Sequence, residues 1–354
     1  MNDAIEAIAA RIKSAQAQGE PLRIRGGGSK DFYGGAHQGA VLSTGSLKGI
    51  IAYEPSELVL TARAGTPLAE IEATLRERGQ MLAFEPPHFA APATFGGCIA
   101  AGLSGPRRAY AGSVRDFVLG VRLLDGKGDD LRFGGQVMKN VAGFDLSRLL
   151  TGSMGTLGVI LEASVKVLPL PVAEATLRFE HTAASAIALL NEWGGQPLPL
   201  SASAWRGGEL FVRLSGARAA VDAALHALGG EQFDAATATD LWQDIREQRD
   251  AFFDSALPLW RLSIKSTTPP LNLAGRQLIE WGGSLRWLAT DADAATVHEA
   301  ARYGGGHATL FRGGDKCAGV FQPLPAAMMA IHRKLKQALD PAGIFNRGRL
   351  YPDF

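Results

Sequence analysis

The sequence predicts an α+β protein built from two domains. At 354 residues the chain is longer than a single hydrophobic core usually extends. Glycine-rich loops gather in about the first 160 residues, whereas strand and helix patterns alternate after Pro169-Leu170-Pro171. Such a proline-rich stretch ends a strand and is typical of a domain boundary. Alternating strands and helices form a sheet covered by a layer of helices, which is an α+β arrangement.

The first half is expected to hold short strands between two amphipathic helices. Ile5, Ile8 and Ile12 recur at helical spacing near the N-terminus. Thr66 is a good N-cap and Pro67 suits the first helical position, so a second helix is expected to begin there. The expected strands are Leu22–Arg25, Glu57–Ala62, Phe117–Leu124, Asp130–Phe133 and Ala163–Leu168, with a hairpin turn at Asp125-Gly126-Lys127-Gly128. Residues 84–113, rich in Pro, Gly and Ala, are expected to lack regular structure and to be functional.

The second half is expected to alternate strands with helices. Asp291 is expected to cap a helix that runs to about Tyr303, and Asp340-Pro341 to stop a final amphipathic helix. The other expected elements are a helix near 217–228 and the strands Glu209–Leu214, Leu259–Ile264, Leu285–Ala289 and His307–Phe311.

Composition and charge exclude several classes of function. Lys+Arg 36 and Asp+Glu 35 nearly balance, so no net field favours nucleic acid. Cys98 and Cys317 are too few for a disulfide framework or for a four-cysteine iron–sulfur cluster within this chain. The N-terminus lacks the regions of a signal peptide, and no run reaches the roughly 18 apolar residues that span a bilayer. We therefore expect a cytoplasmic protein without a membrane span, for which peripheral attachment to the inner membrane through partners stays open.

The strongest functional signal is the glycine triplet of Arg25-Gly26-Gly27-Gly28-Ser29-Lys30. Glycine has no Cβ, so such a loop can turn its backbone N–H groups inward and bind a phosphate or pyrophosphate. A flexible turn is the alternative for the triplet alone. Two further glycine-rich segments, Thr94-Phe95-Gly96-Gly97 and Gly155-Thr156-Leu157-Gly158-Val159, favour a long dinucleotide held by several backbone loops.

Neither common nucleotide-binding template fits the triplet. The loop lacks the third glycine of the Rossmann fingerprint, and the following Asp31-Phe32-Tyr33-Gly34-Gly35 cannot open a helix. No Gly-x-x-x-x-Gly-Lys-Ser/Thr segment occurs either.

In order and spacing, the three loops resemble the vanillyl-alcohol-oxidase (PCMH-type FAD-binding) superfamily of flavoproteins. The resemblance covers nearly the whole chain and includes Thr61–Leu68 and a closing Asp340–Gly348 segment similar to that of the 2-hydroxy-acid dehydrogenase branch. Within this branch the chain is most similar to an FAD-binding subunit of bacterial glycolate oxidase (glycolate dehydrogenase). The segments that carry this likeness are Arg25–Lys30, Phe84–Phe89, Gly105–Arg108, Lys139–Leu149 and Gly306–Leu310.

The resemblance implies a domain organisation, an activity and partners. A PCMH-type FAD-binding domain of two subdomains is expected at 1–170, an α+β cap domain at 171–320, and a C-terminal helix and tail at 321–354 that returns to the FAD-binding domain. The implied substrate is a small 2-hydroxy acid, with glycolate oxidised to glyoxylate. The implied partners are a larger homologous FAD subunit and an iron–sulfur subunit, and the low cysteine count agrees with one-electron carriers lying in another chain.

Carried over to this sequence, the resemblance implies three groups of FAD contacts. Gly26, Gly27, Gly28, Ser29 and Lys30 would hold the pyrophosphate, with Arg25 and Lys30 complementing its charge. The second phosphate loop would be Thr94, Gly96 and Gly97, and backbone atoms of Gly155, Gly158 and Val159 would approach the adenosine half. Pro87, His88 and Gly102 complete the expected contacts.

Non-covalent FAD is expected, because Ser29 and Lys30 stand where many relatives place a flavin-linked histidine. His88 and Cys98 are chemically able to attach to flavin, with contact or packing as the ordinary alternative. Lys139 is a candidate for placing positive charge near the flavin ring, and an exposed surface lysine is the equal alternative.

Two residues are candidates for substrate chemistry. Substrate-oxidising relatives carry a histidine-rich metal motif, whereas Gly304–Lys316 retains one histidine, so no metal is expected. His307 is a candidate base and Arg312 a candidate partner for a substrate carboxylate, with structural roles as the alternative. This departure indicates that the larger subunit oxidises glycolate, while this chain holds a flavin for electron transfer or assembly. A non-catalytic structural subunit with a degenerate flavin site and a self-sufficient FAD oxidase of another 2-hydroxy acid stay open as alternatives.

Overall fold

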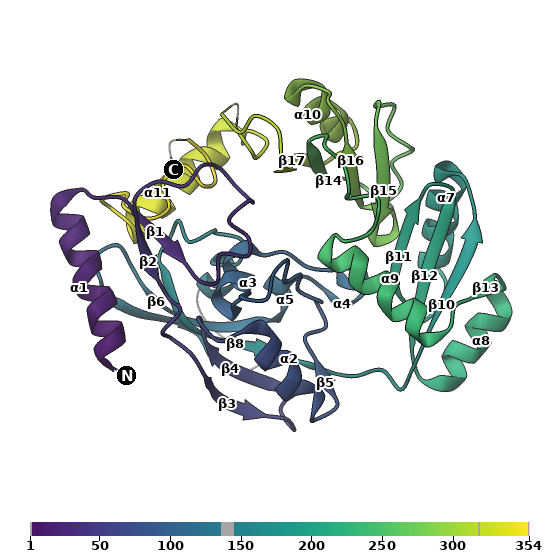
Figure 1. The fold of residues 1–354 in the computed structure, drawn as a ribbon, viewed down its shortest axis with the longest axis horizontal. Helices are drawn as coiled ribbons and strands as arrows, with labels where there is room; N and C mark the ends of the chain where they lie inside the picture. Colours follow the sequence, from purple (N-terminus) through teal and green to yellow (C-terminus); the bar gives the residue numbers. More distant parts are fainter. Residues whose placement is uncertain (1, 136–144, 318, 353) are drawn as a thin grey trace.

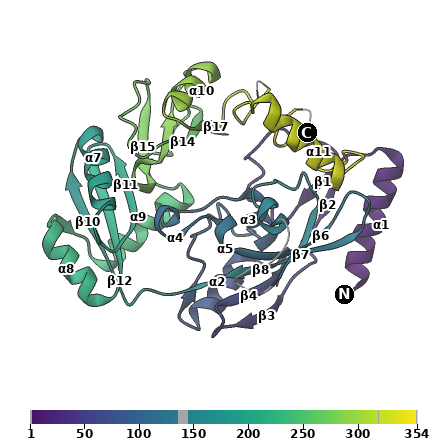
Figure 2. The same ribbon diagram turned by 180° about the vertical axis from the view of Figure 1, so that it is seen from behind.

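Two antiparallel sheets organise the computed structural model, which describes residues 2–135, 145–317, 319–352 and 354 (Figure 1). Lys139 lies outside the described residues. The sheets stand in different halves of the molecule, and the view from behind shows the same arrangement (Figure 2). The chain passes to the second half near residue 170 and returns to the first half with α11. The mixed helix and sheet content confirms the predicted α+β class.

The first sheet has the strand order β3-β4-β8-β6-β7 and antiparallel neighbours throughout. Its strands are β3 (Ile50–Glu54), β4 (Val59–Arg63), β6 (Val118–Leu124), β7 (Asp130–Gly134) and β8 (Val159–Lys166). The central strand β8 is buried along most of its length, because side chains pack on both of its faces. The predicted hairpin joins β6 to β7, which pair from Leu124↔Asp130 to Gly120↔Gly134.

Helices cover both faces of this sheet. The helix α2 (Leu68–Arg76) buries Leu68, Ile71 and Leu75, which lie on one side of the helix, and α3 (Phe95–Ala101) packs into the same core. The N-terminal helix α1 (Asn2–Gln18) packs against the other face of β8. Three shorter helices complete this half: α4 (Arg108–Ala111), α5 (Val114–Phe117) and α6 (Leu146–Leu149).

The second sheet has eight strands in the order β13-β10-β12-β11-β15-β16-β14-β17. Its strands are β10 (Ala173–Glu180), β11 (Leu200–Arg206), β12 (Glu209–Gly216), β13 (Glu231–Gln232), β14 (Leu259–Ser263), β15 (Arg276–Glu280), β16 (Leu285–Ala289) and β17 (His307–Arg312). The helices that accompany it are α7 (Ala183–Gly194), α8 (Arg218–Leu228), α9 (Ala235–Glu247), the short 3-10 helix η1 (Trp281–Gly283) and α10 (Ala294–Tyr303). Helices α7 and α8 pack with Val212 of β12, whereas α9 packs with the neighbouring Phe211 and therefore lies on the opposite face.

One end of the second sheet faces the loops of the first half. Trp287 of β16 and Phe311 of β17 form a buried cluster with Tyr33 and Met154, which belong to the glycine-rich segments. This contact places the inner face of β14–β17 beside the loops in which a dinucleotide is expected.

The C-terminal segment returns to the N-terminal strand. After α11 (Ala326–Leu339), Ile344 O accepts a hydrogen bond from Leu22 N at 2.7 Å, and Asn346 N donates one to Leu22 O at 2.9 Å. The tail thus lies beside β1 (Leu22–Arg25), which pairs in parallel with β2 (Ala40–Ser43); β5 (Gln80–Met81) pairs with β9 (Leu168–Pro169). The domain limits at 170 and 320 stay predictions. Within the described ranges, no helix is long and apolar enough to cross a bilayer.

Three local predictions were wrong. Thr66 does not cap α2, because its Oγ1 exchanges hydrogen bonds with the backbone of Gly49 and Pro67 takes the N-cap position. Asp293, rather than Asp291, caps α10 by accepting a hydrogen bond from Thr296 N. The segment 84–113 contains α3 and α4; in α3 a capping Thr94 and buried apolar residues stabilise the short helix.

Candidate functional site

The glycine triplet packs directly against the segment that leads into α3. A Cβ on Gly26 would lie 2.3 Å from Thr94 Oγ1, and one on Gly27 would lie 1.4 Å from the carbonyl oxygen of Pro92. Gly28 has a φ of +76°, which side-chain-bearing residues rarely adopt. The two loops therefore approach each other backbone to backbone, which only glycine permits.

A cavity lies between these two loops and the C-terminal tail. The loop residues that line it are Arg25, Gly26, Gly27, Gly28, Ser29, Lys30, Asp31, Thr94 and Gly97, and other lining residues include His37, Met154, Asn346 and Arg349. The structure thus brings together most of the predicted pyrophosphate contacts. Their roles toward FAD stay predictions.

Within α3 the two predicted glycines have different surroundings. Thr94 caps the helix by accepting a hydrogen bond from Gly97 N at 3.3 Å, and Gly97 lines the cavity. A Cβ on Gly96 would instead lie 2.6 Å from the Ala64 Cβ, so Gly96 allows close packing against the loop after β4. Gly102 ends the helix in the left-handed conformation, with a φ of +64°.

The charges at the mouth of the cavity are unequally engaged. Asp31 pairs with Arg23 at 2.6 Å and with Arg25 at 2.9 Å. Lys30 Nζ lies 3.4 Å from the carbonyl oxygen of His88 and 5.6 Å from the centre of the Phe89 ring, and no described carboxylate pairs with it. Burial lowers the pKa of Lys30, since it disfavours the charged form. An ammonium held in this way is stabilised by an incoming anion, so the cavity fits a phosphate group.

Two cavity residues were missed by the sequence analysis as cofactor contacts. Asn346 Oδ1 accepts a hydrogen bond from Ile24 N at 2.7 Å, and its Nδ2 donates one to Met154 O at 2.6 Å, so it joins β1 to the third loop. Arg349 donates hydrogen bonds to the carbonyl oxygens of Tyr33 and Gly35, and burial lowers its pKa to about 10. Asn346 belongs to the closing Asp340–Gly348 segment that carries part of the family resemblance, whereas no sequence signal indicated Arg349.

The third glycine loop reaches the cavity through Met154. A Cβ on Gly155 would lie 2.6 Å from Asn346 Nδ2, and one on Gly158 would lie 2.7 Å from the carbonyl oxygen of Leu124. The side chain of Val159 is buried in the core beneath α1. These three residues therefore pack the loop against its neighbours, and their contact with an adenosine stays a prediction.

The segment around His88 faces the second sheet. His88 Nε2 lies 3.1 Å from Glu72 Oε2, and Glu247 of α9 accepts a hydrogen bond from His88 N at 3.0 Å. Pro87 lines a small separate cavity beneath β16. Burial raises the pKa of Cys98 to about 12, so its thiolate is scarce at neutral pH, which favours the packing role for this cysteine.

The two candidate catalytic residues lie at opposite ends of β17. Arg312 donates a hydrogen bond to Gln248 Oε1 at 2.7 Å and stacks over the Phe32 ring at 4.8 Å. His307 lies about 16 Å away along the strand, at the edge of a wide cavity. The structure therefore does not bring His307 and Arg312 together around one small substrate, and each role stays a separate prediction. Among the described residues, no three His, Cys, Asp or Glu side chains converge as a metal site.

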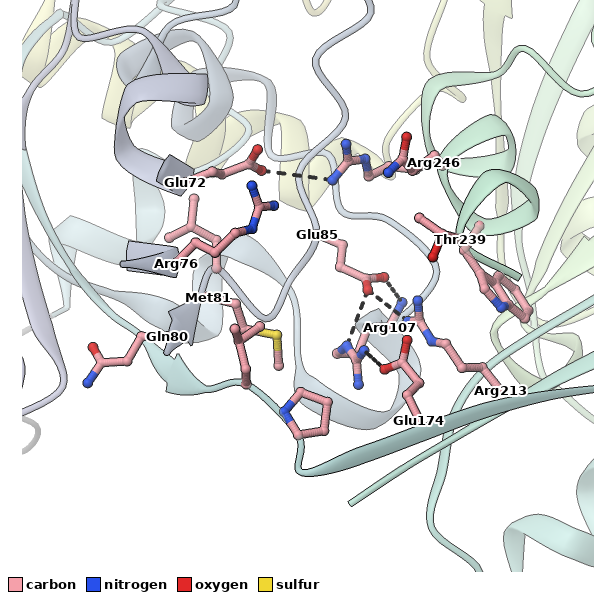
Figure 3. Close-up of a pocket in the computed structure, with 15 residues that line it drawn as sticks. Glu72, Arg76, Gln80, Met81, Glu85, Arg107, Glu174, Arg213, Thr239 and Arg246 are labelled. Carbon is pink, nitrogen blue, oxygen red and sulfur yellow. Dashed lines mark hydrogen bonds and ion pairs between the residues drawn. The ribbon is translucent and has the colours of Figure 1, made fainter. Parts of the chain in front are cut away.

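A second, strongly charged cavity lies between the two sheets (Figure 3). Glu85 contacts Arg107 at 3.2 Å and Arg213 of β12 at 2.8 Å, and Arg107 also pairs with Glu174 of β10 at 2.8 Å. Because Glu85 and Arg107 belong to the first half and the other two residues to the second sheet, this network ties the halves together. Its central charges already have partners, so we assign it a structural role.

Glu280 is a buried carboxyl on the inner face of the second sheet. Its Oε1 accepts a hydrogen bond from Trp287 Nε1 at 2.7 Å. The pKa of Glu280 is raised to about 7. Burial is the main cause, the nearby charge of Glu85 adds to it, and the Trp287 hydrogen bond and the charge of Arg261 act against it.

The raised pKa predicts that the fold becomes less stable as the pH rises from about 4.5 to about 7. The folded protein holds this proton while the unfolded chain loses it, so the free energy of unfolding should fall by on the order of 3 kcal/mol between about pH 4.5 and pH 7. Glu280→Gln, which keeps the acceptor for Trp287 but cannot ionise, should remove this fall, whereas Glu77→Gln on the exposed end of α2 should not. Urea unfolding at pH 5 and pH 8 measures the difference. Equal pH dependence in wild type and Glu280→Gln would contradict the prediction.

Comparisons with known proteins agree with this geometry. A family model described as an FAD binding domain matches residues 3–134. Glycolate oxidase subunit GlcE of Escherichia coli (strain K12) is 49% identical over 351 residues, which cover 99% of this chain and 98% of that protein. Glycolate oxidase subunit GlcD of Bacillus subtilis (strain 168) is 33% identical over 160 residues, which cover 44% of this chain and 34% of that protein.

A solved structure is similar to this chain in fold. An alkyldihydroxyacetonephosphate synthase superposes with a TM-score of 0.65 at 17% identity, covering 96% of this chain and 75% of the other, and this likeness shows the fold alone. The match with GlcE, by contrast, extends over almost the full length of both proteins at high identity. The chain therefore belongs to the family of FAD-binding flavoproteins that includes the glycolate oxidase subunit GlcE.

Proposed function

We propose that this chain is an FAD-binding subunit of a glycolate oxidase complex, which oxidises glycolate to glyoxylate. The observation that carries the proposal is the 49% identity with a GlcE subunit over nearly the whole of both chains. The match of an FAD binding domain to residues 3–134 supports FAD as the cofactor. Ser29 and Lys30 at the first loop support non-covalent attachment.

The residues of the cavity would bind the pyrophosphate of FAD. The backbone of Gly26, Gly27 and Gly28 would approach the phosphates closely, because no side chain stands between. Lys30 would supply the neutralising charge. Thr94 would hold the first turn of α3, including Gly97, at the wall of the cavity through its hydrogen bond with Gly97 N. FAD supplies hydride acceptance and one-electron transfer when bound. The chain's own task is to position it and to exclude water from the site.

The proposed partners are a larger homologous FAD subunit and an iron–sulfur subunit. The partial likeness to a GlcD subunit supports the first of these. The presence of only two cysteines supports the second, because a four-cysteine cluster needs another chain. We place the complex in the cytoplasm, with attachment to the inner membrane through these partners.

A structural subunit with a degenerate flavin site is the second candidate. The observation that favours it is the pairing of Arg23 and Arg25 with Asp31, which leaves fewer cations free to bind phosphates. Lys30 is not engaged in this way, so the FAD-binding function is the better supported of the two.

Purification with and without the partner subunits tests the proposal. We expect the chain to carry FAD that acid precipitation releases, and we expect glycolate to bleach the flavin under anaerobic conditions only in the complex. Protein that neither carries nor binds FAD would contradict the proposal and support the structural role. Bleaching by this chain alone would instead show a self-sufficient oxidase.

A further inference from the structure

A cavity of about 670 Å³ lies between the C-terminal tail, the turn after the glycine triplet and the inner face of the second sheet. Arg261, Arg302 and His307 supply its positive or ionisable groups, and Tyr33, Thr309 and Tyr351 supply hydroxyl groups. Among its described lining residues there is no aspartate or glutamate. A cavity with this lining selects anions.

Arg261 is the central group of this cavity. It lies on β14 between Trp287 of β16 and Thr309 of β17 in the sheet register, so its side chain shares the inner face with theirs. Its guanidinium stacks at 5.1 Å from the centre of the Trp281 ring. No hydrogen bond or ion pair joins Arg261 to any other described residue. Burial lowers the pKa of Arg261, while the nearby charges of Tyr33 and Glu280 act to raise it.

The fully buried arginines, by contrast, have partners among the described residues, although Nη1 of Arg286 has none. Arg213 pairs with Glu85, Arg286 donates to the carbonyl oxygens of Gly283 and Thr268, and Arg349 donates to those of Tyr33 and Gly35. The half-buried guanidinium of Arg261 carries five N–H donors, and none of them has an acceptor among the described residues. Arg261 is therefore set apart from these arginines as the one that awaits an external acceptor.

The hydroxyl of Tyr33 adds a donor on the opposite wall. The Tyr33 ring is held by contacts with Phe311 at 5.0 Å and Phe321 at 5.7 Å, and its own carbonyl oxygen is held by Arg349. Burial raises the pKa of Tyr33, so the hydroxyl keeps its proton at neutral pH and can donate it in a hydrogen bond. A guanidinium and a phenol that line one cavity together suit a carboxylate, which can accept hydrogen bonds from both.

We propose that this cavity binds a small 2-hydroxy or 2-oxo carboxylate, with the guanidinium of Arg261 as the receptor for its carboxylate group and the hydroxyl of Tyr33 as a second donor. His307, an exposed residue that also lines the cavity, would be the contact for the hydroxyl or oxo group of such an acid. The identity of the acid rests on the proposed glycolate oxidase function, whereas the anion site rests on the cavity alone. Arg261 thus replaces Arg312 as our candidate for the carboxylate contact.

Calorimetric titration of the full chain with glycolate, glyoxylate and oxalate tests the proposal. Arg261→Gln is expected to weaken binding of the best of these probes about tenfold or more, because a charge-assisted pair is lost. Arg261→Lys should recover part of the affinity, since it keeps the charge but not the planar fork. Tyr33→Phe should weaken binding by a smaller factor, about threefold. The matched control is Arg218→Gln on the exposed start of α8, which should bind as wild type does.

Unchanged affinity in Arg261→Gln, with wild-type near-UV circular dichroism, would overturn the proposal. So would tighter binding of inorganic phosphate than of every carboxylate probe. If Arg261→Gln fails to fold, two other results count against the proposal. One is that Tyr33→Phe binds the probes as tightly as wild type does, and the other is that a folded Arg261→Lys does not bind them. FAD is scored separately by absorbance: a chain that binds oxalate through Arg261 but not FAD refutes the proposed function alone, and the converse refutes this inference alone.

Discussion

Gly27→Ala is expected to abolish tight FAD binding. The added methyl group would lie 1.4 Å from the carbonyl oxygen of Pro92, and a backbone atom cannot move aside as a flexible side chain can. The glycine loop must therefore shift by more than an ångström from the segment that leads into α3. We expect the FAD affinity to fall roughly a hundredfold, which corresponds to about 3 kcal/mol, and strain of this kind also lowers the free energy of unfolding by about 1–3 kcal/mol.

Gly194→Ala is the matched control for this substitution. A Cβ at this position at the end of α7 meets nothing within 4 Å, and Gly194 is not among the glycines with positive φ. The control should retain flavin and stability as wild type does. The ratio of flavin to protein absorbance after gel filtration, followed by fluorescence titration with FAD, measures both variants. A full flavin content in Gly27→Ala would show that the triplet does not form the phosphate site.

Lys336→Met is expected to give the largest loss of stability. Lys336 Nζ lies 2.8 Å from Asp340 Oδ2 and donates hydrogen bonds to the carbonyl oxygens of Thr156 and Phe345 at 2.6 and 2.9 Å. Asp340 is 1% exposed, so removing the lysine leaves a buried carboxylate without its counter-charge. Breaking a buried pair from one side costs about 3–5 kcal/mol.

The same substitution should also weaken FAD binding. Asp340 accepts hydrogen bonds from Ile344 N and Phe345 N, and these residues lead directly to Asn346 beside β1. A loosened tail would release the Asn346 contact with the glycine loop. Lys334→Met, on the exposed side of the same helix, should change the free energy of unfolding by less than about 0.5 kcal/mol. Urea unfolding compares the two, and a loss below about 1 kcal/mol in Lys336→Met would contradict our assignment.

Local patterns predicted much of the fold near their own residues. The β6–β7 hairpin follows from an Asp-Gly-Lys-Gly turn between alternating strands, and the final helix ends at Asp340-Pro341 as expected. The pairing of β11 with β15, which joins Trp205 to Ile279, did not follow from any local signal. Strand neighbours of this kind are chosen by packing between distant segments, which the period of side chains along one strand does not encode.

The candidate site was likewise predicted in part from local sequence, while the rest depended on tertiary packing. Glycine clusters predicted where the backbone could approach a ligand, because the absence of a Cβ is a property of each residue alone. They did not separate glycines that line the cavity from those that pack elsewhere: Gly97 faces the cavity, whereas Gly96 packs on Ala64. The neighbours of an absent side chain are set only when the loops meet.

The pairing of charged side chains is the feature that the sequence predicted least well. Arg25 and Lys30 were equal candidates for a phosphate contact in the sequence, yet Asp31 pairs with Arg25 while no described carboxylate pairs with Lys30. Arg312 was a candidate for the carboxylate contact, but it donates a hydrogen bond to Gln248, whereas Arg261 has no hydrogen-bond or ion-pair partner among the described residues. The residues alone determined the α+β class and the glycine loops, because these depend on local composition, order and spacing, and the resemblance of these loops to known flavoproteins indicated the family. Which cations remain available to a ligand was decided by tertiary structure alone, since electrostatic pairing depends on distances in space that separation along the chain does not set.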